Sequence, residues 1–383
     1  MRHSAVVHEL LLVGSVPLRP ASRVFDVLAE RLPGLLVRVP DGDQHGWVIA
    51  AVQSFIRNPN LERCGQAELS RDGIAVPLFR LKPGVTSAEL VLGPYGFAET
   101  AIRSYTDFVE RRAQGRFPKE TRFQVTFPGP GTSAYFLQLP PEELLPLART
   151  ALLREIERLV ATVPSSDLAI QLDIAMEAEH EEWRRRPHAF DTPIHKTFDW
   201  TLEQMADSAA WLANQIPSEA ELGFHICSIW HHYPHGGQDN NVLVEAANAI
   251  VSRLKRPLGY LHVPTIPQHA EPDFRPLANL RLQAGAKLYL GVIHGDDGLK
   301  GALRRIDAAR KFVPEFGIAS FCGLGNPAVN ASPDDAAASP FAEAKNPEAR
   351  SRQGTTRSFG EGTGNPLIYV LDLHRQLAQK SSR

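Results

Sequence analysis

Two cysteines and a histidine stand at the ends of apolar runs, where they could bind a metal ion. His225 and Cys227 end the run LGFHIC, and Cys322 ends IASFC. In a β-strand, side chains two positions apart point to the same side, so His225 and Cys227 could both reach one ion. Histidine nitrogen and cysteine sulfur are ligands that Zn²⁺ prefers. With His262 at the end of another apolar run, GYLH, the sequence predicts a zinc site made of these four residues.

The alternative is that Cys227 and Cys322 are ordinary buried thiols, as free cysteines usually are. The chain has 3 cysteines at wide spacing, which do not make a disulfide framework and favour a reducing compartment. We recognise no signal peptide and no apolar segment of roughly 20 residues. We therefore expect a cytoplasmic protein.

Apolar runs of strand length alternate with longer amphipathic segments. Continuous apolar strands are typical of a parallel sheet that helices cover on both faces. About eight strand–helix repeats predict one α/β domain over residues 1–383, a (β/α)8 TIM barrel, with a doubly wound open sheet as the alternative. The predicted strands are residues 8–13, 35–39, 123–127, 168–174, 222–226, 259–263, 288–293 and 316–321. The predicted helices are residues 21–32, 96–113, 141–163, 201–215, 241–254, 298–312 and a terminal helix in PLIYVLDLHRQLAQK.

Two stretches fall outside this alternation. Residues 62–93 are expected to form one or two inserted β-hairpins. Residues 327–365 are rich in Pro, Ala, Ser, Asn and Gly. That composition buries little apolar surface, so we expect a long mobile loop there.

Polar side chains at the carboxyl ends of the strands are the candidates for a site, because in a β/α barrel these ends meet on one face. Beyond the four predicted metal ligands, the candidates for substrate binding or catalysis are Ser15, Asp41, Asp43, Gln171, Asp173, Glu177, Trp230 and His294.

Other titratable residues nearby are expected to have simpler roles. His231, His232 and His235 lack regular ligand spacing and are expected to form pocket wall, with direct ligation as the alternative. The glutamates at 177, 179, 181 and 182 are expected at the solvated start of a helix or loop, and Glu177 is the one close enough to a strand end to touch substrate. The aspartates at 296 and 297 are expected to cap the following helix or, alternatively, to orient His294.

The overall charge excludes some classes of partner. The formal net charge is −2, which gives no support to binding of nucleic acid or of membrane surfaces. We expect a monomer or homodimer that acts on small molecules.

Five short motifs resemble the catalytic barrel of the cobalamin-independent methionine synthase family, in a superfamily that also holds uroporphyrinogen decarboxylase-like barrels. VGSVP resembles the family's IGSFP, IQLD its IQID and HIC its HMC. GVIH resembles the strand that ends in the family's catalytic histidine, and CGLG also matches. The motifs stand in the family's order between Val13 and Asn326. The resemblance implies a single-barrel relative of that family.

The resemblance also implies roles for particular residues. His225, Cys227 and Cys322 would be zinc ligands. The family's remaining ligand is a glutamate that ends the next strand, and here that strand ends in His262, with Glu245 as the other candidate.

Further roles follow for the substrate. Ser15 and Asp173 match positions that bind the amino-acid part of the family's thiol substrate. His294 matches the histidine that moves a proton to the leaving group.

The reaction implied is the transfer of a methyl or alkyl group to a thiol. Zinc lowers the pKa of the thiol, and the resulting thiolate attacks the methyl carbon. The donor could be a methylated folate, another methylated small molecule or a methoxy compound. A metal-assisted lyase or hydrolase, in which zinc activates water or polarises an oxygen, is the alternative. A metal-independent decarboxylase and a non-catalytic binding protein also remain open.

Overall fold

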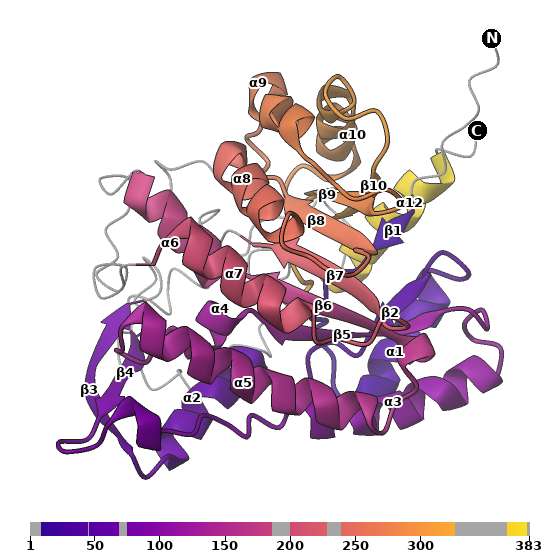
Figure 1. Cartoon of the computed structure of the whole chain (residues 1–383). Coiled ribbons are helices and arrows are strands. Elements are labelled where there is room, and N and C mark those ends of the chain that lie inside the picture. Colours follow the sequence, from indigo (N-terminus) through magenta and orange to yellow (C-terminus); the bar gives the residue numbers. More distant parts are fainter. Residues whose placement is uncertain are drawn as a thin grey trace, which may run out of the picture.

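Eight parallel strands form a nearly closed barrel in the computed structural model, which describes residues 9–44, 46–68, 75–185, 200–227, 239–325 and 366–380 (Figure 1). Around the barrel the order is β1, β2, β5, β6, β7, β8, β9 and β10. Bridges from Leu10 to Leu36 and from Ser15 to Gly42 close the circle between β1 and β2. The strands are β1 Leu10–Leu11, β2 Arg38–Pro40, β5 Arg122–Pro128, β6 Leu168–Ile174, β7 Glu221–Ile226, β8 Tyr260–Pro264, β9 Lys287–Ile293 and β10 Gly317–Ser320.

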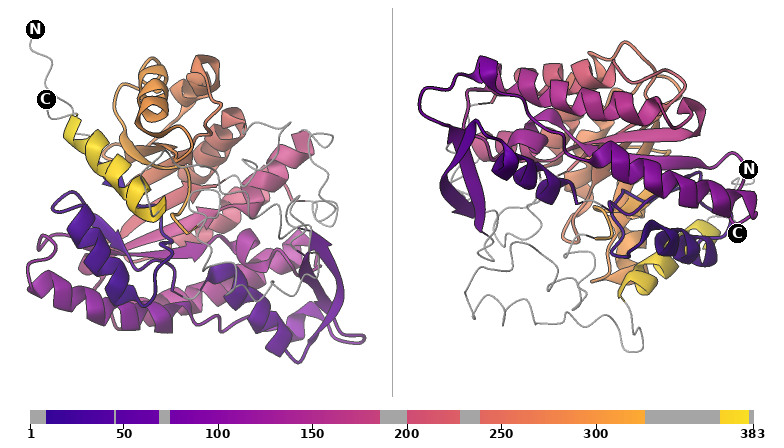
Figure 2. Two further views of the ribbon diagram at one scale, coloured as in Figure 1. Left: turned by 180° about the vertical axis from the view of Figure 1, so that it is seen from behind. Right: turned by 90° about the horizontal axis from the view of Figure 1, so that it is seen from below.

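The predicted (β/α)8 fold is confirmed, and the open-sheet alternative is wrong because β1 and β2 meet. Helices surround the sheet, and α12 lies against both α10 and α1 to complete the ring (Figure 2). The helices of this ring are α1 Ala21–Arg31, α3 Phe97–Ala113, α5 Pro141–Val160, α7 Leu202–Ala213, α8 Asn240–Val251, the short α9 Glu271–Phe274, α10 Gly298–Ala309 and α12 Pro366–Lys380.

Three additional helices follow directly after strands β2, β5 and β6. They are α2 Trp47–Arg57, α4 Pro130–Ala134 and α6 Met176–Arg185, and α4 contacts both of the others. Because these helices begin where the strands end, they lie over the carboxyl side of the barrel.

A β-hairpin begins one residue before the segment where hairpins are expected, and its strands are β3 Leu61–Glu68 and β4 Ala75–Leu81 (Figure 1). It is anchored to the chain after α4. The backbone N–H of Phe79 donates to the carbonyl of Phe136 at 2.9 Å, and that of Gln138 donates to the carbonyl of Phe79 at 2.8 Å. The Phe79 ring also packs edge-on against Phe55 of α2. The hairpin therefore ties α2 to the segment that follows α4.

Strand alternation separates an inner from an outer core. Leu10 belongs to the large cluster beneath the helices, whereas Leu11 packs with Tyr260 and Tyr289 in a second, small cluster. Successive residues of a strand point to opposite faces, so the second cluster fills the barrel interior. Gly223 makes room for it, because a Cβ at that position would lie 2.0 Å from the Tyr260 ring.

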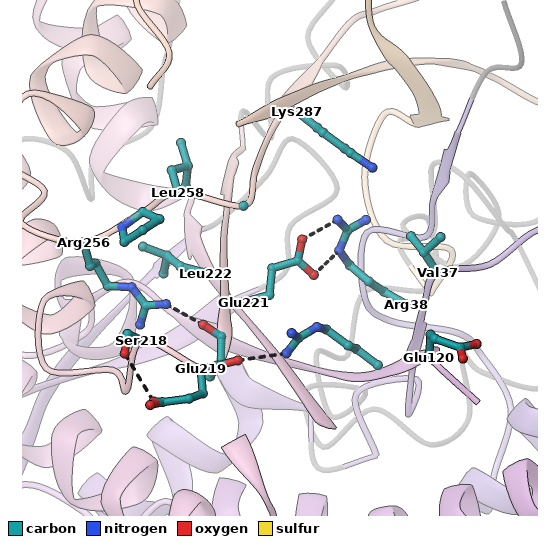
Figure 3. A pocket seen from close by; sticks show the side chains of 14 residues that line it. Val37, Arg38, Glu120, Ser218, Glu219, Glu221, Leu222, Arg256, Leu258 and Lys287 are labelled. Atoms are coloured by element: carbon teal, nitrogen blue, oxygen red, sulfur yellow. Dashed lines mark hydrogen bonds and ion pairs between the residues drawn. The ribbon is translucent and has the colours of Figure 1, made fainter. Parts of the chain in front are cut away.

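A buried arginine occupies the amino end of the interior. Arg38 makes two hydrogen bonds to the carboxylate of Glu221, at 2.5 and 2.7 Å (Figure 3). Its guanidinium also donates to the Tyr289 hydroxyl at 2.9 Å and lies 4.5 Å from the centre of the Tyr260 ring. A buried charge needs such partners, and the network lies at the end of the barrel opposite the strand termini that carry the candidate site, where Arg38 and Glu221 line a second pocket (Figure 3).

Some sequence predictions fall outside the described residues. They are the loop over residues 327–365, Trp230 and the three histidines of HHYPHGG. Within the described ranges, none of the helices has the length and apolar character that crossing a membrane requires.

The docking of α12 should be sensitive to acid because it buries a histidine. His374 is fully buried, its Nδ1 donates to the carbonyl of Val370 at 2.8 Å, and burial lowers its pKa to about 4. The unfolded chain takes up this proton near the ordinary pKa of 6.5, so stability is retained above that value and is lost as the pH falls towards about 4. Lowering the pH from about 7.5 to about 5 should reduce the free energy of unfolding by roughly 2 kcal/mol through this one residue.

Urea unfolding of the wild type and of His374→Phe at the two pH values measures this cost. The variant should lose about 2 kcal/mol less than the wild type over the same interval. Equal losses in the two proteins would contradict the assignment.

Candidate metal centre

Three side chains from two strand ends form a compact cluster at the carboxyl end of the barrel. His225 and Cys227 come from the end of β7, and Cys322 follows β10. Their ligand atoms all lie within 4.8 Å of one another, and the two sulfur atoms are 3.8 Å apart with no disulfide between them. No other group of three or more histidine, cysteine and acidic side chains comes this close within the described ranges.

His262 lies behind this cluster and orients His225. Its Nε2 is 3.1 Å from the carbonyl oxygen of Ser320, and its Nδ1 is 2.7 Å from Nδ1 of His225. A carbonyl only accepts hydrogen bonds, so Nε2 of His262 carries a proton. Burial holds the pKa of His262 well below its ordinary value, so the ring is neutral and its Nδ1 is an acceptor. His225 must then donate from Nδ1, which leaves the Nε2 lone pair of His225 for the cluster.

The structure brings neither of the two expected fourth ligands, His262 and Glu245, into the cluster. His262 uses both ring nitrogens in hydrogen bonds and stands outside the cluster. Glu245 lies on α8, where its carboxylate forms an ion pair with Arg185 at 2.6 Å. The cluster therefore contains three ligand groups from the described part of the chain.

Without a cation, the side chains of the cluster tend to keep their protons. The neighbouring Cys322 and burial raise the pKa of Cys227 well above its ordinary value, so its thiol keeps its proton. Burial lowers the pKa of His225, but Cys322 and Asp173 outweigh it and raise that pKa overall. A divalent cation would replace these protons, since metal binding and protonation compete for the same atoms.

A cavity of about 210 Å³ adjoins the cluster. All three cluster residues line it, as do three of the predicted substrate or catalytic residues, Ser15, Asp43 and Asp173.

Ser15 lies beside the glycines that follow Cys322. The backbone N–H of Gly325 lies 3.2 Å from both the side-chain and the carbonyl oxygen of Ser15. A Cβ at Gly323 would lie 2.2 Å from the Ser15 hydroxyl oxygen. The motifs VGS and CGLG thus meet in space, and glycine is required where they touch.

Asp173 is held by Gln171, which lies two residues earlier on the same face of β6. The Gln171 amide donates to Asp173 at 2.8 Å and to the carbonyl of Val13 at 2.5 Å, and it accepts from the Tyr260 hydroxyl at 3.0 Å. Burial raises the pKa of Asp173 to about 7. Gln171 is absent from the cavity lining and supports Asp173, and its predicted contact with substrate stays a prediction.

Asp43 stands at the start of α2 with a left-handed backbone, φ 56°. Burial raises the pKa of its carboxyl to about 6, while the N–H groups of Trp47 and Gly46 and the charge of Arg19 act in the opposite direction. Asp41 accepts a hydrogen bond from the backbone N–H of Asp43 at 2.9 Å and is absent from the cavity lining. Asp41 therefore shapes the turn that presents Asp43.

Glu177 is a brace between helices and is absent from the cavity lining, and its expected contact with substrate stays a prediction. Its carboxylate accepts from the Thr132 hydroxyl, and that hydroxyl accepts from the backbone N–H groups of Ala175 and Met176. The prediction that the glutamates at the start of α6 are solvated is wrong. Glu179, Glu181 and Glu182 are buried on α6, which packs against α4, α7 and α8.

His294 is buried, with its ring stacked on that of Phe321, the residue before Cys322, at 5.2 Å between ring centres. It is not part of the cavity lining. Asp297 stands at the N-cap of α10 but makes no capping hydrogen bond, and its carboxylate accepts from the buried Arg305 at 2.6 and 2.8 Å. Because Arg305 also donates to the carbonyl of Val292 at 3.0 Å, this pair fixes the turn after β9.

Sequence reasoning missed several residues of the cavity wall. Thr126 lines the cavity and sits near the end of β5, where the rule used for the other strands could have found it. Trp47 and Phe136 also line it, from the start of α2 and from the segment after α4. No sequence pattern marks these two aromatics, because the hairpin and the short helices place them.

No protein-family model matches the sequence, and no curated protein matches it. Among solved structures, the chain is similar to a protein from Listeria monocytogenes that is provisionally assigned as a vitamin-B12-independent methionine synthase. The TM-score is 0.52 and the sequence identity 14%, and the match covers 96% of this chain and 96% of that one. At this identity the comparison shows a shared barrel fold.

Proposed function

We propose that this protein is a zinc-dependent methyl or alkyl transferase whose acceptor is a thiol. One observation carries the proposal: the side chains of His225, Cys227 and Cys322 converge beside a cavity. The likeness in fold to a provisionally assigned methionine synthase supports it as an analogy.

The residues fit a zinc ion. Zinc–sulfur bonds of about 2.3 Å in a tetrahedral site place two sulfurs about 3.8 Å apart, and Cys227 and Cys322 have a sulfur separation of 3.8 Å. His225 offers a nitrogen lone pair, and the hydrogen bond that its Nδ1 donates to His262 orients it. Three protein ligands with a fourth position for substrate are typical of catalytic zinc sites, whereas structural sites have four.

A zinc ion bound here would supply a Lewis acid that lowers the pKa of a substrate thiol. The ligands favour a thiol over water as the group to be activated. Two cysteine thiolates balance the charge of a divalent ion, and soft sulfur ligands suit a further sulfur ligand. Sites that activate water often use neutral histidines, which leave the charge of the ion uncompensated.

Other residues would handle the rest of the thiol substrate. Asp173 lines the cavity and is the direct register neighbour of His225, so it would take up the proton that the thiol loses. Ser15 lines the same cavity beside Gly323 and would contact the part of the substrate remote from sulfur. The proton transfer that the resemblance gives to His294 stays a prediction.

Zinc content tests the ligand set. We expect about one zinc ion per chain by mass spectrometry of the metal, because three convergent ligands suffice for a catalytic site. Cys227→Ser and Cys322→Ser should each lose most of it. Cys64→Ser is the matched control, since this half-buried cysteine lies on the hairpin strand β3. Wild-type zinc content in both cluster variants would contradict the site.

His262 should act on metal affinity through His225. His262→Ala removes the acceptor for the Nδ1 proton of His225, so zinc affinity should fall about 10–100-fold, as for other residues that support a ligand. His262→Gln can keep one acceptor and should retain part of the affinity. Competition with a zinc chelator measures the constants, and His374→Phe controls for the loss of a buried histidine far from the site. An affinity equal to that of the control would remove this role from His262.

Cobalt substitution separates thiol activation from water activation. Addition of homocysteine, cysteamine or 2-mercaptoethanol to the cobalt-loaded protein should produce a new thiolate-to-cobalt absorption band. The band should be absent in Cys322→Ser. If none of the thiols changes the spectrum of a fully loaded protein, a lyase or hydrolase that activates water is favoured instead.

A further inference from the structure

We propose that the methyl donor is a small organic cation, an onium compound whose methyl group is bound to a positively charged nitrogen or sulfur. The inference rests on the proposed transfer to a thiol and names the class of the second substrate. It comes from the charge, the size and the aromatic wall of the cavity beside the cluster.

The charge of the cavity favours a cation. Two carboxyl groups line it, those of Asp43 and Asp173, and none of the lining residues within the described ranges is a lysine or arginine. A folate or another polyanionic donor would meet like charges there, and Arg19, whose charge acts on Asp43, does not line the cavity. The volume of about 210 Å³ is also below the roughly 300–1,000 Å³ of pockets for larger ligands. The cavity therefore suits a small cation.

Two aromatic side chains complete the wall. Trp47 and Phe136 both line the cavity. The faces of aromatic rings attract cations, and recognition of methylated ammonium groups by such rings together with carboxylates is a recurrent solution. A methylated onium carries its charge behind methyl groups, so it can contact rings without a hydrogen-bond partner for each substituent.

The fold holds this wall in place. The carboxyl of Asp43 accepts from the backbone N–H of Trp47, so the anion and the first ring are fixed to each other at the start of α2. The carbonyl of Phe136 accepts from Phe79 of the hairpin, and the ring of Phe79 packs on Phe55 of α2. The inserted hairpin therefore connects the segment that carries Phe136 to the helix that carries Trp47. By holding these two rings, the hairpin has a role in recognising the donor.

The chemical step balances without a further reactant. The thiolate sulfur attacks the methyl carbon, the new sulfur–carbon bond forms, and the bond between that carbon and the onium nitrogen or sulfur breaks. The bonding pair leaves with the nitrogen or sulfur, so RS⁻ and CH₃–NR₃⁺ give RS–CH₃ and NR₃. The leaving amine or sulfide is neutral and needs no proton, so the place of His294 outside the cavity lining is no obstacle.

Calorimetric titration of the full zinc-loaded chain with matched probes tests the proposal. Choline and 3,3-dimethyl-1-butanol have the same shape, but only choline is charged. Choline should bind on the order of tenfold more tightly, because its charge adds attraction to rings and carboxylates. Choline should also bind more tightly than 2-aminoethanol, whose primary ammonium instead mimics the amino group of a thiol acceptor. Tetramethylammonium and trimethylsulfonium then show whether nitrogen or sulfur carries the methyl group.

Variants connect binding to the named residues. Asp43→Asn should weaken choline by about tenfold and leave 3,3-dimethyl-1-butanol nearly unchanged, because only the charged probe loses an attraction. Asp239→Asn is the matched control, since this aspartate caps α8 and does not line the cavity. Trp47→Leu should weaken choline more than its uncharged analogue, with Trp211→Leu on α7 as the control.

Three results would overturn the inference: equal binding of choline and its uncharged analogue, tighter binding of 2-aminoethanol than of choline, or no saturable binding of any methylated cation. Zinc content and the cobalt–thiolate band are measured on the same preparation. If both are present while choline fails to bind, the donor class is wrong and the proposed transferase stands. If zinc is absent, the transferase fails by itself, and binding of choline to the metal-free protein still decides whether the cavity takes an onium.

Discussion

The hydrogen bond between Nδ1 of His225 and Nδ1 of His262 is the interaction on which the candidate site depends. It exists because the parallel register makes Asp173, His225 and His262 direct neighbours across β6, β7 and β8. The carbonyl of Ser320 accepts a hydrogen bond from Nε2 of His262, so the proton of His262 is on that nitrogen. Nδ1 of His262 is therefore an acceptor, and Nδ1 of His225 carries the proton between the two rings. His262 thus stands at the end of β8 and holds the ring of its neighbour His225 in place.

The rest of the fold surrounds the three neighbouring side chains of Asp173, His225 and His262. The buried network of Arg38 fills the barrel interior at the amino end, and the cavity lies at the opposite end, where Thr126 of β5, Asp173 of β6, His225 of β7 and Cys322 after β10 line it. Glycines allow the close contacts there, as where Gly323 approaches Ser15. The short helices α2, α4 and α6 and the hairpin add the wall that a minimal barrel lacks. Selectivity for a second substrate would then reside in these additions, and metal chemistry in the strand ends.

The fold could be predicted from the sequence because each barrel strand is a continuous apolar run between helical patterns. The prediction for β6 matches the observed strand at both ends. The convergence of His225, Cys227 and Cys322 could also be predicted, since it needs only strand parity and the common edge of parallel strands. The hydrogen bonds of His262 could not be predicted, because they depend on which side chains lie next to its ring. The burial of the α6 glutamates was misjudged and the two aromatics were missed for a similar reason. Packing among α2, α4, α6 and the hairpin decides their surroundings, and no periodic pattern encodes that packing.

X-ray absorption at the zinc edge of the loaded full chain tests the central claim most directly. A site formed by His225, Cys227 and Cys322 predicts two sulfur neighbours at about 2.3 Å and nitrogen or oxygen neighbours at about 2.0–2.1 Å. Addition of a thiol substrate should raise the sulfur count from two to three, as a lighter ligand leaves the fourth position. A first shell without sulfur, or one that no thiol changes, would contradict the account.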